Sequence, residues 1–182
     1  MKRTMLVFAA ALAAISILPA CGGTSGGGPQ VAKVTPGTLP AGETFKGVWY
    51  NRVFGDLHLV PEGNHVNGKY KSPQSGVWGK VHGTITGDVI KFEWVEHKTG
   101  AIGPGSTKSG KGYWKFVPGE PPAPAAMKGE WGLGDNEVGG GEWDCIRQKD
   151  VEPKLDAIGN DAAPTDGAWD KEATPPPPDK KK

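Results

Sequence analysis

Beyond Cys21 the chain has no apolar run long enough to cross a lipid bilayer, so no membrane-spanning helix is expected there. It contains only two cysteines, Cys21 and Cys145, and its 21 Lys and Arg nearly balance its 20 Asp and Glu. The formal net charge of +1 gives no indication of a nucleic-acid partner or of a membrane surface bound by electrostatics alone. Glycine (29 residues) and proline (17) are frequent, and no segment of the central part is predicted to be a helix.

Residues 1–20 have the pattern of a signal peptide. Lys2 and Arg3 give a positive start, and an apolar run follows over Met5–Leu18. This run is too short to span a bilayer comfortably, so it predicts a removable signal rather than a permanent membrane segment.

Cys21 comes directly after the expected cleavage point, behind the small residue Ala20. This arrangement resembles the lipobox of bacterial lipoproteins, with Pro19 as a departure from the usual small residue. The resemblance implies that Cys21 receives lipid chains, such as palmitate, which anchor the protein to a membrane. By resemblance to lipoprotein sorting rules, Gly22 implies the cell outer membrane, with the protein facing the periplasm or the cell surface.

The mature chain divides by composition into three segments. Residues 21–44 comprise the lipidated cysteine and a tether rich in Gly, Ser, Thr and Pro, which is predicted to be flexible. Residues 45–148 hold six of the seven tryptophans and all three tyrosines, so they form the folded domain. Residues 149–182 are polar and rich in Pro and Lys, and they are predicted to be a disordered tail.

The folded domain is predicted to be all-β, because runs of alternating apolar and polar residues recur between turn signals. The eight runs are Lys46–Phe54, Asp56–Val60, His65–Ser72, Gly76–Thr86, Asp88–His97, Lys108–Val117, Met127–Leu133 and Glu142–Gln148. Short turns between sequential strands predict an eight-stranded antiparallel up-and-down meander. Closure into a barrel would remove both exposed edges.

The alternation also predicts which side chains face the core. In the first run Trp49, Asn51 and Val53 share one face, opposite Tyr50, Arg52 and Phe54. In the third run Val66, Gly68, Tyr70 and Ser72 face inward, and Asn67, Lys69 and Lys71 face solvent. In the last run Trp143, Cys145 and Arg147 lie together, so Cys145 is expected to be buried and unpaired. His58 and His82 lie opposite the core faces and are expected to be solvated.

The strands resemble those of the calycin superfamily, which includes the avidins and lipocalins. Gly47–Asn51 is similar to the first strand of avidin and streptavidin, Gly68–Ser72 to their third and Phe92–Trp94 to their fifth. Repeated Gly-x-Trp elements ending in Arg147 also look like short bacterial lipoproteins of uncharacterised role. The resemblance implies a barrel in which Trp49 packs beneath Arg147 and closes one end.

The resemblance to avidins also implies a candidate ligand site at the barrel mouth. Asn51, Tyr70 and Ser72 match residues that hydrogen-bond a ligand, and Trp94 and Trp131 match residues near its wall. One wall tryptophan and one aspartate of the avidin pattern have no counterpart, so biotin is not the expected ligand. The residues alone leave open a structural role, in which the polar trio satisfy one another or a buried water.

No catalytic, metal or cofactor site is expected. The four histidines lack the close spacing of a metal site, and no serine or cysteine lies in a nucleophile motif. The sequence therefore predicts a non-catalytic, lipid-anchored module of the cell envelope that binds a small or extended ligand. The alternative is a protein-interaction module, such as a periplasmic protease inhibitor or an envelope assembly factor. In an inhibitor, the segment before residue 45 would reach into the target enzyme.

Overall fold

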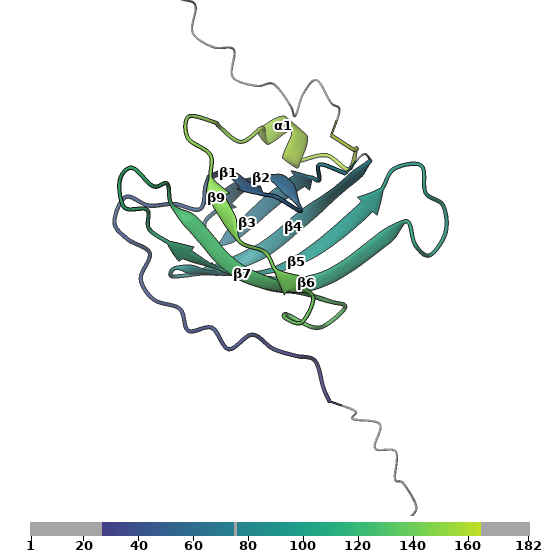
Figure 1. Ribbon diagram of the computed structural model, residues 1–182, viewed down its shortest axis with the longest axis horizontal. Coiled ribbons are helices and arrows are strands. Elements are labelled where there is room, and N and C mark those ends of the chain that lie inside the picture. Colours follow the sequence, from purple (N-terminus) through teal and green to yellow (C-terminus); the bar gives the residue numbers. More distant parts are fainter. Residues whose placement is uncertain (1–26, 75, 165–182) are drawn as a thin grey trace, which may run out of the picture.

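The computed structural model describes residues 27–74 and 76–164. The expected signal peptide and Cys21 lie outside the described residues. Nine strands and one short helix are assigned in the described part (Figure 1). In chain order they are β1 (Gly47–Asn51), β2 (Gly55–Glu62), β3 (His65–Lys71), β4 (Val77–Thr86), β5 (Val89–Lys98), β6 (Thr107–Val117), β7 (Ala126–Leu133), β8 (Gly141–Glu142), β9 (Cys145–Arg147) and α1 (Leu155–Ile158).

The strands close into a barrel because the end of the sheet returns to its beginning. β1 to β7 pair antiparallel in chain order, and β9 pairs with both β7 and β1. β8 and β9 share one register on β7, since Glu142 lies opposite Glu130 and Cys145 lies opposite Met127. The two segments therefore act as one interrupted eighth strand, in the place predicted for residues 142–148. The prediction of an all-β, eight-stranded antiparallel barrel is confirmed.

Aromatic rings fill much of the barrel interior, because alternation along each strand sends every second side chain inward. Trp143 stacks on Phe54 with 4.0 Å between ring centroids and meets Tyr70 edge-on at 5.3 Å. Trp114 meets Trp143 edge-on at 5.0 Å and stacks on Phe92 at 3.8 Å. All five side chains are buried. The free Cys145 is buried as well, as its facing predicts.

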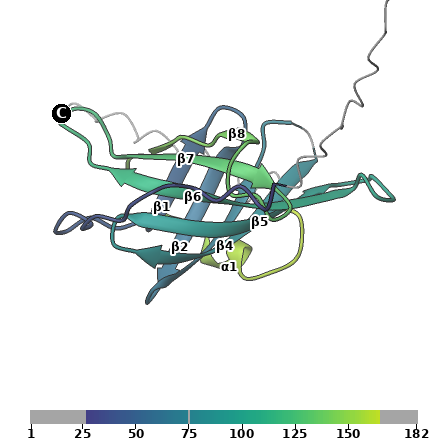
Figure 2. The same cartoon turned by 90° about the horizontal axis from the view of Figure 1, so that it is seen from below.

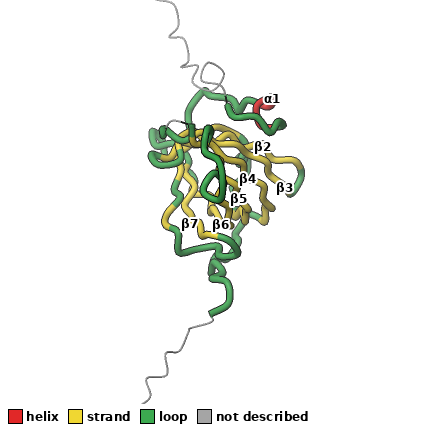
Figure 3. Tube along the Cα trace, turned by 90° about the vertical axis from the view of Figure 1, so that its right-hand side faces the viewer, coloured by secondary structure: helices red, strands yellow, loops and turns green. Residues whose placement is uncertain are grey.

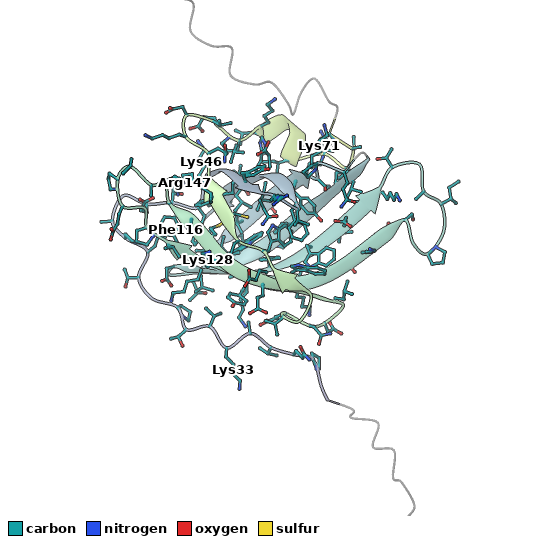
Figure 4. All side chains as sticks on the ribbon, viewed as in Figure 1. Lys33, Lys46, Lys71, Phe116, Lys128 and Arg147 are labelled. Carbon is teal, nitrogen blue, oxygen red and sulfur yellow. The ribbon has the colours of Figure 1, made fainter. Side chains whose placement is uncertain are left out.

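Arg147 covers one end of the barrel, which we call the closed end. Its guanidinium carbon lies 4.7 Å from the ring centroid of Trp49 and 5.4 Å from that of Phe116, which is labelled with Arg147 in Figure 4. Arg147 also donates hydrogen bonds to the Glu43 carboxylate at 2.8 Å and to the Thr44 carbonyl. A desolvated cation over an aromatic face contributes about 1–2 kcal/mol, so these contacts stabilise the end of the barrel.

Residues 151–164, which we call the C-terminal strap, lie against the outer face of β2, β3 and β4 (Figures 1 and 3). The strap includes α1, and its Pro153 is buried. These residues belong to the segment for which a disordered tail was predicted. The rest of that segment, 165–182, lies outside the described residues.

The C-terminal strap buries two outward-facing side chains. His58 is 2% exposed and accepts a hydrogen bond at Nδ1 from the Lys154 amide at 3.1 Å. Lys69 is 1% exposed, and its ammonium donates to the carbonyl of Asn160 at 3.2 Å and that of Ala162 at 2.6 Å. The predicted facing of both residues is right, but their predicted exposure to solvent is wrong, because the strap covers them.

Residues 30–44, which we call the N-terminal strap, cross the outside of the barrel over β6 (Figure 2). The Ala32 amide donates to the Glu137 carboxylate at 2.8 Å, and the Lys115 ammonium donates to the Thr35 carbonyl at 2.8 Å. These bonds fix the course of a segment that composition predicts to be flexible. No helix in the described part of the chain is long and apolar enough to cross a membrane.

Candidate functional site

The five predicted ligand-site residues all lie in the half of the barrel opposite Arg147. We call this the open end; it carries the β1–β2, β3–β4, β5–β6 and β7–β8 connections. Their inward facing follows from cross-strand register, since Tyr70 pairs with Gly79 and Trp131 with Gly112 inside the sheet. The residues that gather here are Asn51, Tyr70, Ser72, Trp94 and Trp131.

Asn51 and Ser72 both bind the backbone of the turn that joins β1 to β2. The Asn51 Oδ1 atom accepts from the amides of Val53 (2.7 Å) and Phe54 (2.9 Å), while its Nδ2 donates to the Asp144 carbonyl (2.6 Å). The Ser72 hydroxyl donates to the Val53 carbonyl at 3.0 Å. In this state, therefore, two members of the polar trio hold the turn in place and do not bind each other.

The third member, Tyr70, donates its hydroxyl to the Glu96 carboxylate at 3.1 Å. Burial, reinforced by the charge of Glu96, raises the pKa of the Tyr70 phenol far above its usual value, so it remains a hydrogen-bond donor. Glu96 was not among the predicted site residues. Its facing could have been found from the alternation, because it lies two residues beyond the inward-facing Trp94.

Trp94 and Trp131 form an aromatic wall on neighbouring parts of β5 and β7. Their ring centroids are 5.4 Å apart in an edge-on arrangement. The Trp94 indole donates to the Gly132 carbonyl at 3.2 Å, which fixes the ring. Trp131 is partly exposed, so the wall continues from the buried interior to the rim of the open end.

Phe54 fills the space between these residues, although the alternation predicted that it would face outward. Its ring lies 5.9 Å from that of Tyr70 and 6.0 Å from that of Trp131, edge-on to both, and stacks on Trp143. Val53, predicted to face inward, is 60% exposed. The two facings are exchanged because β1 ends at Asn51 and the chain turns there, which breaks the two-residue period.

Beneath Phe54, the indole nitrogen of Trp143 is buried and has no hydrogen-bond acceptor in the described part of the chain. A buried donor without an acceptor costs about 1–3 kcal/mol. The open end thus combines flat aromatic walls and a ring inserted from a turn. This arrangement can accept a flat ring in the place of Phe54.

A second concavity, of about 580 Å³, lies outside the barrel between the sheet and α1. Its apolar lining comes from Val60 and Val95 on the sheet and from Leu155 and Ile158 on the strap. None of the predicted site residues lines it. Within residues 27–74 and 76–164, no group of three His, Cys, Asp or Glu is placed to hold a metal ion.

Comparisons with protein-family models, with curated proteins and with solved structures found no match to this chain. The barrel has the eight-stranded antiparallel architecture that the calycin resemblance implied.

Proposed function

We propose that this protein is a lipid-anchored component of the cell envelope whose barrel is a non-catalytic binding module of calycin type. The open end would take a small flat ring in the place of Phe54. The observation that carries the ligand proposal is the Phe54 ring itself, which a turn places against the rings of Trp143, Tyr70 and Trp131. The membrane anchor is supported by the pattern of residues 1–21.

Phe54 acts as an internal stand-in for the ligand. Its ring is stacked on one indole and is held edge-on by Tyr70 and Trp131, as a planar ligand would be. Because Phe54 belongs to a turn, it can move out without breaking the strand pairing of β1 with β2. The bonds of Asn51 and Ser72 to Val53, together with the ring contacts of Phe54, then contribute to the free energy needed to open the site.

Replacing Phe54 by alanine should leave a cavity with the size of one aromatic ring at the open end. Benzene is a suitable probe, because it has the size and shape of the lost ring. We expect benzene to bind Phe54→Ala and, when stacked on Trp143, to shift the Trp143 indole N–H resonance through its ring current. Phe116→Ala at the closed end is the control, since its cavity lies away from that indole.

Two results would count against the ligand proposal. One is an equal shift of the Trp143 resonance by benzene in Phe54→Ala and in Phe116→Ala, and the other is no benzene binding to a folded Phe54→Ala. Because Phe→Ala in a core costs about 3–5 kcal/mol, Phe54→Leu provides a less disruptive variant of the same test.

The anchor has a separate test, mass spectrometry of the chain purified from bacterial membranes. We expect a mature protein that begins at Cys21 and carries acyl chains. A measured mass that includes residues 1–20, or that corresponds to an unmodified Cys21, would rule out the anchor. Either result would leave the ligand proposal unchanged.

A further inference from the structure

The N-terminal strap runs from the open end of the barrel to the closed end. At its start, the Gln30 amide donates to Asn136 Oδ1 at 2.8 Å, in the β7–β8 connection of the open end. At its finish, Arg147 of the closed end binds Glu43. The chain that precedes residue 30 therefore approaches the barrel from the open end.

The distance from there to the proposed anchor is short. Only five residues, 22–26, separate Cys21 from the first described residue, Gly27. Six extended residue steps span at most about 20 Å. A lipid on Cys21 would hold the barrel close to the membrane with the open end on the side of the anchor.

The open end carries exposed aliphatic side chains on three separate connections. Val53 of the β1–β2 turn is 60% exposed, Leu133 at the end of β7 is 53% exposed and Ile102 of the β5–β6 hairpin is fully exposed. Scattered apolar side chains are normal on a surface, and Val117, Ile146 and Leu155 are exposed elsewhere. The three at the open end differ from those because they lie on the side from which the N-terminal segment approaches.

The β5–β6 hairpin projects beyond the rest of this end (Figure 1). Gly110 of β6 pairs with Leu133, the last residue of β7. The three residues of β6 that precede Gly110, Thr107 to Ser109, therefore extend beyond the end of β7. The hairpin is held by a hydrogen bond from the Lys98 amide to the Ser106 carbonyl at 2.9 Å, and the neighbouring Thr99 amide bonds to Gly76 at 2.8 Å. Ile102 is thus presented on a supported tip.

Basic residues lie beside this aliphatic tip and elsewhere at the open end. Lys98 and Lys108 flank the hairpin, and Arg52 lies in the β1–β2 turn; all three are exposed and form no ion pair with the residues that the structure describes. Aliphatic residues that enter the interface, with cations beside them, match the chemistry of an anionic phospholipid surface.

We propose that the open end faces the membrane that carries the anchor and that the Ile102 hairpin inserts its tip into the lipid interface. This inference rests on the proposed anchor at Cys21. It adds an orientation and a second membrane contact, and it implies that a ligand reaches the open end from the membrane side.

The test uses the lipidated full chain in vesicles of phosphatidylethanolamine and phosphatidylglycerol, with a polarity-sensitive NBD dye on Ile102→Cys. The dye attaches selectively, because Cys145 is buried and Cys21 would carry lipid. Val117→Cys is the matched control, an exposed aliphatic residue at the opposite end of β6. At position 102 we expect a shift of emission to shorter wavelength and quenching by nitroxide-labelled lipid; at position 117 we expect neither.

A second arrangement separates the failure of this inference from the failure of the anchor. A chain that begins at Gly22 behind a hexahistidine tag can be bound to the same vesicles through nickel-chelating lipid. If mass spectrometry finds no acyl chains on Cys21, this tethered chain still reports the orientation. An unshifted dye at position 102 in the tethered chain, or equal quenching at 102 and 117, would overturn the inference.

Discussion

Acid should loosen the C-terminal strap, because the strap binds only the neutral form of His58. The Lys154 amide donates to His58 Nδ1, so this nitrogen must keep its lone pair. Burial, with a further contribution from the charge of Lys154, lowers the pKa of His58 from 6.5 to about 4. In the sheet, His58 lies between Val48 and Lys69.

The size of the effect follows from the two pKa values. A histidine released from the strap takes up a proton near pH 6.5, whereas the covered histidine does so only near pH 4. The stabilisation from the neutral, covered ring is therefore complete above pH 6.5 and is lost as the pH falls toward about 4. The difference corresponds to about 3 kcal/mol of stability.

NMR of the His58 ring protons measures its pKa directly, and urea unfolding at several pH values measures the free energy. The matched control is His58→Asn, because the asparagine Oδ1 can accept the Lys154 amide bond but does not titrate. We expect the wild-type chain to lose stability relative to this variant between pH 6.5 and about 4. An ordinary pKa for His58, or a constant difference between the two chains, would refute this reasoning.

Three further predictions concern the barrel itself. Arg147→Met should lower the free energy of urea unfolding by about 2 kcal/mol, because it removes the contacts at the closed end. The control Lys46→Ala removes an exposed ion pair and should change this free energy by less than about 1 kcal/mol. Burial raises the pKa of the Cys145 thiol, so a thiol reagent should modify it only after unfolding; rapid modification of the native chain would contradict this. Gly79→Ala should cost about 2 kcal/mol, because its Cβ would lie 2.4 Å from the Tyr70 ring, while Gly105→Ala, with open space around it, should be neutral in the same unfolding assay.

The strands and most inward facings could be predicted from the sequence because a two-residue period is a local property. Tyr70, Trp94 and Cys145 face the interior as the alternation predicts. Val53 and Phe54 could not be assigned in this way. The direction of these two side chains depends on the residue at which β1 ends, and the alternation of apolar and polar residues does not show where a strand ends.

The burial of His58 and Lys69 under the C-terminal strap could not be predicted from the composition of the strap. Lys69 donates to the carbonyl groups of Asn160 and Ala162, which any residue type could supply, and also to Asn160 Oδ1 at 3.0 Å. His58 accepts a hydrogen bond from a backbone amide, which any residue type except proline could supply. A polar segment can thus bury polar and charged side chains in part through its main chain, although its side chains predict no core. Whether Asn51, Tyr70 and Ser72 contact a ligand stays a prediction.

The placement of the two straps narrows where this barrel can engage a ligand. The N-terminal strap crosses the outer face of β6, the C-terminal strap covers β2 to β4, and Arg147 fills the closed end. The open end differs from these surfaces because Phe54, the ring that covers Trp143 there, belongs to a turn and not to a strand. A protease inhibitor would instead need residues before 45 to be free, yet residues 30–44 are bonded along the barrel. The contacts of the straps therefore favour a ligand at the open end over insertion of the N-terminal segment into an enzyme.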